Sequence, residues 1–263
     1  MQVKEQVITN FSLRASTYDD YAHVQFAAVN RLAESLRSSC RELVDGPILE
    51  IGCGTGFFTI QLIECFSNRE IIVSDLSPQM LDKCRERVAN HFGAIPQNVK
   101  FKIIDGESFE QTGTFALIGS SFTLHWLTNL EPAVTSLLCS LKVGGKLFFS
   151  VPSDKCFPEW QKLCQETGVP FTANPLPSSA VFANQANSYQ YLWTMQEDSY
   201  VHKYSSILHF LRDIKALGGT TSVHKTSLGI KRLLHLINYS NNYSPSSFSI
   251  TYNVLFGEIT KVQ

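Results

Sequence analysis

The sequence predicts an α/β fold in which a mostly parallel sheet is covered by helices on both faces. Between residues 46 and 152, short apolar runs alternate with segments of helical spacing, a pattern typical of parallel sheets. Of the 263 residues, 44% are hydrophobic and 17% are charged, so the chain can form a sizeable core and is not a disordered polypeptide. The 22 basic and 23 acidic residues nearly balance, which argues against nucleic-acid binding through general basicity.

The expected elements begin with a helix near Thr17. Thr17 and Asp20 form a near-capping box, and apolar residues from Ala22 to Leu36 then recur on one helical face. After Asp45 the pattern changes to strands that alternate with helices. Strands are expected at 47–51, 70–74, 99–104, 115–119 and 146–151, and helices at 57–66, 78–92 and 130–141.

The C-terminal part of the chain predicts a different organisation. Residues 168–196 contain no charged side chain and include three prolines, which indicates a loop-rich insertion over one end of the sheet. A short strand is expected at 200–204 and a helix at 206–217, with Gly218-Gly219 as its C-terminal signal. The alternating run 248–256 predicts a late strand.

The cysteines and the N-terminus indicate an intracellular protein. Seven scattered cysteines without a C-x-x-C pair suit reduced thiols better than a disulfide framework or a zinc site. The N-terminus lacks the apolar segment of a secretory signal, and polar residues interrupt the uncharged run 111–130. We therefore expect a soluble, cytoplasmic protein with no membrane or nucleic-acid partner.

The most informative stretch is Ile-Leu-Glu-Ile-Gly-Cys-Gly-Thr-Gly at residues 48–56. An apolar strand runs into glycines at alternate positions, and a helix follows. Such glycines let the backbone turn sharply and approach a ligand closely, while helix N–H groups face an anionic part of it. A dinucleotide-binding G-x-G-x-x-G loop needs a third glycine where Phe57 stands, so a nicotinamide oxidoreductase is disfavoured.

With Glu50 two residues before its first glycine, this loop resembles motif I of class I S-adenosylmethionine-dependent methyltransferases. Asp75 follows nineteen residues after Gly56, where a carboxylate can accept the ribose hydroxyls, and Asp105 follows the third strand, where the family places an acid near the adenine amino group. Residues 141–145 (LKVGG) resemble the family's L-K-P-G-G. The resemblance implies a Rossmann-like, seven-stranded sheet, S-adenosylmethionine as cofactor and no metal. The implied cofactor-binding residues are Glu50, Gly52, Cys53, Gly54, Gly56, Asp75, Leu76, Met80, Asp105, Gly106, Glu107 and Ser121.

Four further segments resemble malonyl-[acyl-carrier protein] O-methyltransferases of biotin synthesis. They are 11–25, with its Ala-x-x-Tyr-Asp pattern, 75–81 (DLSPQML), 210–219 and 251–257. The resemblance implies methyl transfer from S-adenosylmethionine to the free carboxylate of a malonyl thioester, giving an ester that primes pimeloyl synthesis for biotin. Two departures concern acyl recognition: the family's arginine is displaced to Arg14, and its Gln-Trp is His125-Trp126 here.

We expect a single methyltransferase domain. Residues 1–45 are expected to form an N-terminal helical lid, 46–152 the cofactor-binding core, and 153–198 an inserted cap. Residues 199–263 are then expected to supply the C-terminal strands and helices that complete the sheet.

The expected catalytic residues are Tyr18, His125 and Trp126. A carboxylate acceptor, with an ordinary pKa of roughly 4, is already ionised at neutral pH and needs no general base. Alignment and exclusion of water are then the main requirements. Tyr18 could place its hydroxyl beside the reacting methyl or simply pack on the sheet edge. Trp126 could favour the sulfonium through its aromatic face, and His125 could bind the acceptor or be structural.

Basic side chains are the expected partners of the malonyl carboxylate and of the carrier. Arg14, Arg212 and Lys215 are candidates for substrate binding, with solvated surface charge as the alternative. Residues 199–257 hold one acid, Asp213, and six bases, which could dock an acidic acyl carrier protein. The six are Lys203, Arg212, Lys215, Lys225, Lys231 and Arg232.

Two alternatives to this function remain open from the sequence. One is a methyltransferase for another small carboxylate or for a quinone-precursor ring carbon. The other is a non-catalytic module that binds S-adenosylmethionine. The sequence also leaves open whether a carrier protein or coenzyme A presents the acyl group.

Overall fold

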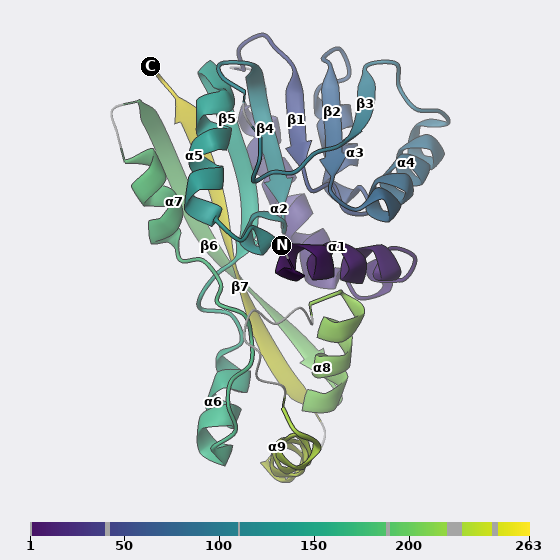
Figure 1. Ribbon diagram of the computed structural model, residues 1–263, viewed down its shortest axis with the longest axis vertical. Helices are drawn as coiled ribbons and strands as arrows, with labels where there is room; N and C mark the ends of the chain where they lie inside the picture. The colour runs from purple at the N-terminus through teal and green to yellow at the C-terminus, as the bar shows by residue number, and fades with distance from the viewer. Residues whose placement is uncertain (1, 40–42, 110, 188–189, 220–227, 244–246) are drawn as a thin grey trace.

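A seven-stranded sheet forms the centre of the molecule, in the order β3-β2-β1-β4-β5-β7-β6 (Figure 1). The computed structural model describes residues 2–39, 43–109, 111–187, 190–219, 228–243 and 247–263. Strands β1 to β5 run parallel, whereas β7 lies antiparallel between β5 and β6. The strands are β1 (Ile48–Ile51), β2 (Ile71–Asp75), β3 (Val99–Ile103), β4 (Phe115–Ser121), β5 (Leu141–Pro152), β6 (Tyr191–Tyr204) and β7 (Phe248–Lys261). The predicted Rossmann-like α/β fold is confirmed.

Helices cover both faces of the sheet, because successive side chains of a strand point to opposite sides. Ile48 packs in one apolar cluster with α2, α3 and α4, whereas Leu49 and Ile51 pack in a second cluster with α5 and α7. The helices are α1 (Gln2–Arg14), α2 (His23–Ser39), α3 (Phe57–Cys65), α4 (Pro78–Phe92), α5 (Leu130–Ser140), α6 (Pro158–Thr167), α7 (Ser179–Ala186), α8 (Ile207–Ala216) and α9 (Ile230–Tyr243). In the described part of the chain, no helix is long and apolar enough to cross a bilayer.

Strands β6 and β7 continue beyond the rest of the sheet, and α6, α8 and α9 gather around their far ends (Figure 1). We call this part, formed by those strand ends and three helices, the lower lobe. Aromatic rings fill its interior: Phe157 lies 5.0 Å from Tyr252 between ring centroids, and Trp160 lies 5.4 Å from Phe210. The lower lobe therefore has apolar packing of its own.

The N-terminal prediction was wrong in detail. The helix expected to begin near Thr17 begins at His23, and a separate helix, α1, precedes it. Between them, Tyr18–Asp20 forms a single 3-10 turn. The Thr17 side chain does not cap a helix, because its hydroxyl donates back to the Arg14 carbonyl. The near-capping box therefore marks a bend between two helices rather than a helix start.

The region expected to be a loop-rich insertion contains more regular structure than its composition predicts. Residues 179–186 form α7, and β6 already begins at Tyr191, so the short strand expected at 200–204 is only the end of a 14-residue strand. Residues 191–198, assigned by the sequence to an inserted cap, thus lie in the sheet. The helix expected at 206–217 is α8, capped by the Ser206 hydroxyl, which accepts from His209 N.

Candidate functional site

The predicted cofactor residues meet in one cavity at the carboxyl ends of the parallel strands. The loop after β1, the end of β2 and the loops after β3 and β4 form its walls, and α1 covers it. All the predicted cofactor-binding residues line this cavity except Gly56. The sequence therefore located the pocket from local motifs that lie far apart along the chain.

The three glycines of the loop serve different purposes, although all have positive φ. A Cβ on Gly52 would lie 2.2 Å from the Thr123 side chain, and one on Gly56 would lie 2.9 Å from Cys84 Sγ. A Cβ on Gly54 meets no atom within 4 Å, since it faces the open cavity. Gly52 and Gly56 are thus required for packing, and Gly54 keeps space for a ligand.

Two carboxyl groups at the centre of the cavity have no ion-pair partner among the described residues. Glu50 Oε2 accepts from the Thr59 hydroxyl at 2.6 Å, and burial raises the pKa of Glu50 to about 8. Asp75 accepts from Gly54 N at 2.9 Å and from Ser77 N at 2.8 Å, and burial raises its pKa as well. A cationic ligand would relieve this electrostatic cost, because opposite charge favours the ionised carboxylates.

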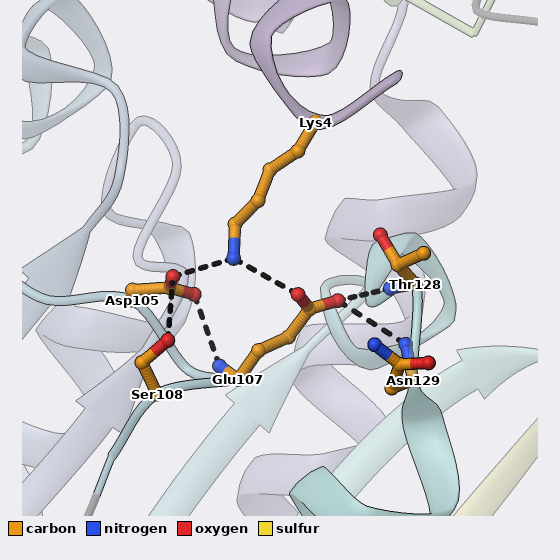
Figure 2. A network of polar contacts seen from close by, with 6 residues as sticks. All are labelled: Lys4, Asp105, Glu107, Ser108, Thr128 and Asn129. Carbon is orange, nitrogen blue, oxygen red and sulfur yellow. Dashed lines mark hydrogen bonds and ion pairs between the residues drawn. The ribbon is translucent and has the colours of Figure 1, made fainter. Parts of the chain in front are cut away.

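At the other end of the cavity, Lys4 of α1 bridges two carboxylates (Figure 2). Its Nζ donates to Asp105 Oδ2 at 2.5 Å and to Glu107 Oε2 at 2.9 Å. The second Glu107 oxygen accepts from the backbone N–H groups of Thr128 and Asn129, at the start of α5. Burial, the largest single influence, would raise the pKa values of Asp105 and Glu107, but the contacts with Lys4 and the hydrogen bonds from nearby backbone N–H groups together outweigh it and lower both pKa values. This network joins α1 to two cavity walls.

The sequence reasoning missed the face of α1 that lines the cavity. Lys4, Val7, Ile8 and Phe11 point into it, and their spacing is that of one helical face. That spacing was the available signal, but the apolar stripe is short. Farther along α1, the Ser12 hydroxyl lies 2.8 Å from the Ser77 hydroxyl, which fixes the helix against the end of β2.

A second cavity adjoins the first, between the core and the lower lobe. The two cavities meet at five side chains that line both: Phe11, Tyr18, Gln25, Phe122 and Trp126. Phe11 and Trp126 pack edge to face with their centroids 5.3 Å apart. Among the described residues, no Lys, Arg, Asp or Glu lines the second cavity. Side chains that line only the second cavity include Phe157, Trp160, Leu176, Leu211, Ile214, Leu228 and Tyr252.

His125 is one of several polar residues that line the second cavity, together with Gln25, Thr172 and Asn174. Its Nδ1 atom is buried and has no hydrogen-bond partner among the described residues. Burial lowers the pKa of the imidazole to about 3, so the ring is neutral at physiological pH. A neutral imidazole with a free nitrogen can hydrogen-bond an entering acceptor group. It cannot supply a positive charge.

The three cations expected to bind substrate do not reach either cavity. Arg14, Arg212 and Lys215 are absent from both linings. On α8, Leu211 and Ile214 face the second cavity, whereas Arg212 and Lys215 are exposed on its outer side. The amphipathic spacing of α8 was the available signal, because its apolar residues share one face and leave Arg212 and Lys215 on the other.

Comparisons with solved structures confirm the fold. The YcgJ protein from Bacillus subtilis aligns with a TM-score of 0.61 at 15% identity, covering 89% of this chain and 99% of that one. Phosphoethanolamine N-methyltransferase 2 from Haemonchus contortus, solved with S-adenosyl-L-methionine, aligns with a TM-score of 0.52 at 16% identity, covering 89% of this chain and 53% of that one. In sequence, the family described as "Methyltransferase domain" matches residues 48–145. The chain therefore has the fold of these solved structures, and its residues 48–145 match the methyltransferase-domain family.

Curated relatives make the resemblance more specific. A malonyl-[acyl-carrier protein] O-methyltransferase from Magnetococcus marinus is 29% identical over 260 residues, covering 94% of this chain and 90% of the relative. One from Halalkalibacterium halodurans is 29% identical over 268 residues, covering 96% of this chain and 97% of the relative. The chain therefore resembles malonyl-[acyl-carrier protein] O-methyltransferases along nearly its whole length, as its motifs predicted.

Proposed function

We propose that this methyltransferase transfers the methyl group of S-adenosylmethionine to the free carboxylate of a malonyl group on an acyl carrier protein. The product is the methyl ester that primes pimeloyl synthesis for biotin. The observation that carries the proposal is the pair of adjoining cavities with Tyr18 and Trp126 at their junction: four carboxyl groups line the first, and no charged side chain among the described residues lines the second. The names of the full-length relatives support malonyl-carrier protein as the acceptor.

The first cavity fits the chemistry of S-adenosylmethionine. Its donor set offers Asp75 to the ribose hydroxyls, Asp105 to the adenine end, and Glu50 to the cationic amino-acid portion. Gly54 leaves room for close approach of the ligand. When bound, the cofactor supplies an electrophilic methyl group on a sulfonium.

The second cavity suits an acceptor that needs no proton transfer. A malonyl carboxylate is ionised at neutral pH, and His125, neutral at that pH, can orient it through Nδ1 without acting as a base. The apolar walls limit water at the junction. The positive sulfonium and the negative carboxylate are therefore poorly solvated before methyl transfer, in which both charges are neutralised. Tyr18 and Trp126 line the junction and would align the acceptor with the methyl group.

A basic and apolar surface on the lower lobe favours a carrier protein over a free acid. Arg212 and Lys215 on α8 and Lys231 and Arg232 on α9 are exposed, and α8 contacts α9. Ile230 is 77% exposed and Leu234 is 52% exposed on α9, close in sequence to Leu228 of the second cavity. Lys225, also expected in this surface, lies outside the described residues. We propose that an acidic carrier docks here.

Purified protein incubated with labelled S-adenosylmethionine tests the acceptor. Malonyl-carrier protein, malonyl-coenzyme A and free malonate are supplied in separate reactions. We expect label in a base-labile ester on the carrier protein. Label only on coenzyme A or malonate would contradict the carrier. Cofactor binding without transfer to any acceptor would instead favour a non-catalytic module.

Charge reversal tests the docking surface. The double variant Lys231→Glu, Arg232→Glu should raise KM for malonyl-carrier protein by about tenfold and weaken the salt dependence of KM, because it removes long-range attraction. KM for malonyl-coenzyme A should change little. Lys83→Glu, an exposed position on α4 far along the chain, is the matched control. An unchanged, equally salt-dependent KM in the α9 variant rules out docking at this surface.

A further inference from the structure

Tyr18 is only partly held by its own packing. It belongs to the 3-10 turn Tyr18–Asp20 between α1 and α2, and its half-buried ring lies beside Phe11, with 6.3 Å between the ring centroids. Yet Tyr18 lines both cavities at their junction. An aligning side chain needs a defined position, since small displacements at a reacting centre reduce rates strongly. Contacts outside the turn must therefore fix it.

Those contacts come from the neighbouring residue, Asp19. Its Oδ1 accepts from the Thr55 hydroxyl at 2.6 Å, and its Oδ2 accepts from the Arg87 guanidinium. Arg87 Nε in turn donates to the Thr55 carbonyl at 2.6 Å, and the guanidinium stacks over the Phe57 ring, 4.2 Å from its centroid. The three side chains close a ring of contacts between the Tyr18 turn, the glycine loop and α4.

We infer that Asp19 and Arg87 are positioning residues that hold Tyr18 in a fixed position relative to the glycine loop. The inference rests on the proposed function of Tyr18 at the junction of the cavities. Thr55 lies between Gly54 and Gly56, in the loop that approaches the cofactor. The Asp19–Thr55–Arg87 contacts therefore fix the position of Tyr18 relative to the cofactor-binding loop, not relative to the lower lobe. Neither Asp19 nor Arg87 lines a cavity, so both act through Tyr18.

Helix α4 offers a matched control for Arg87. Arg85 lies two residues away, pairs with Asp82 at 3.4 Å and stacks over the Phe101 ring, 5.0 Å from its centroid. It thus makes the same two kinds of contact as Arg87 without touching the Tyr18 turn. A loss of kcat shared by Arg87→Gln and Arg85→Gln would show only that disturbing α4 impairs the enzyme.

The test combines kinetics with a double-mutant cycle. Asp19→Asn and Arg87→Gln should each lower kcat by about tenfold or more, with KM for the acceptor changed by less than about threefold. In a Tyr18→Phe or Tyr18→Ala background, the same changes should cost much less, because their effect passes through Tyr18. Arg85→Gln should match the wild type. Thermal unfolding of each variant identifies any that fail to fold, and Asp19→Asn keeps the shape of the side chain.

Hydrogen exchange gives a readout that is independent of the acceptor. Backbone amides of residues 14–22 should exchange faster in Arg87→Gln than in Arg85→Gln or the wild type. Additive losses in the cycle, equal kcat in Arg87→Gln and Arg85→Gln, or unchanged exchange would each overturn the inference. A wild-type protein that methylates no malonyl acceptor would count against the proposed function, while the exchange measurement would still decide whether the contacts hold the turn.

Discussion

Alanine at Gly54 should separate the ligand-facing role of this glycine from its backbone role. Gly54 has φ +53° and Gly93, at the C-terminus of α4, has φ +79°, and a Cβ on either meets no atom within 4 Å. Only Gly54 lines the first cavity. The two substitutions therefore impose the same kind of backbone strain but differ in whether a methyl group enters the proposed cofactor site.

The expected magnitudes follow from that comparison. A left-handed alanine costs roughly 1–2 kcal/mol, so both variants should lose similar stability and a few degrees of Tm. For Gly54→Ala, overpacking against a bound ligand adds roughly 1–3 kcal/mol, which corresponds to about a fivefold to hundredfold rise in Kd. Gly93→Ala should bind S-adenosylmethionine like the wild type.

Isothermal titration calorimetry with S-adenosylmethionine measures both Kd values, and differential scanning calorimetry measures both Tm values. Equal Kd values in the two variants would refute the assignment of Gly54 to the cofactor site. A Tm far lower for Gly54→Ala than for Gly93→Ala would show that the loop itself had collapsed. That result would refute the claim that a Cβ at Gly54 is free of protein contacts.

Three further predictions follow from the charges. Burial raises the pKa of Glu50 from 4.5 to about 8. Between pH 4.5 and about pH 8, the folded protein therefore keeps a proton that the unfolded chain loses. The free energy of unfolding of the wild type, relative to that of Glu50→Gln, should fall as pH rises through this range. A pH-independent difference in urea unfolding would contradict this. Lys4→Gln should lower the free energy of unfolding by about 1 kcal/mol at neutral pH, and the loss should shrink below about pH 4, where Asp105 and Glu107 take up protons. Urea titrations at both pH values measure it, with Lys83→Gln as the control. Because burial keeps His125 neutral, kcat should be level between about pH 6 and 8, and a kcat that rises about tenfold per pH unit would contradict a neutral, non-basic imidazole.

The core of the fold was predictable because its signals are local. Strands β1, β2 and β4 are short, largely apolar runs, and α4 has clear start and stop residues. Helix α4 occupies the expected range Pro78–Phe92, with Ser77 capping Met80 N and Gly93 ending it. Glu50, Gly54, Asp75 and Asp105 meet in one cavity because parallel strands place their carboxyl ends at the same edge.

What escaped prediction depends on contacts between distant segments. Helix α1 packs its inward face over a cavity rather than a core, so only a short apolar stripe marks it. Helix α9 carries exposed Ile230 and Leu234 among polar residues, which makes the buried face of this helix harder to recognise from the sequence. On α8, by contrast, the signal was present: the apolar residues Phe210, Leu211 and Ile214 recur on one helical face, and this spacing places Arg212 and Lys215 on the outer face.

The lower lobe lies away from the parallel strands whose ends form the first cavity. This separation of the two cavities has an evolutionary consequence. Side chains such as Leu211, Ile214 and Leu228 line only the second cavity, which we propose for the acceptor. Substitutions at these positions can change the preferred acceptor while the first cavity stays the same. Related proteins can thus evolve new acceptor preferences through changes in the lower lobe, with the methyl-donor site retained.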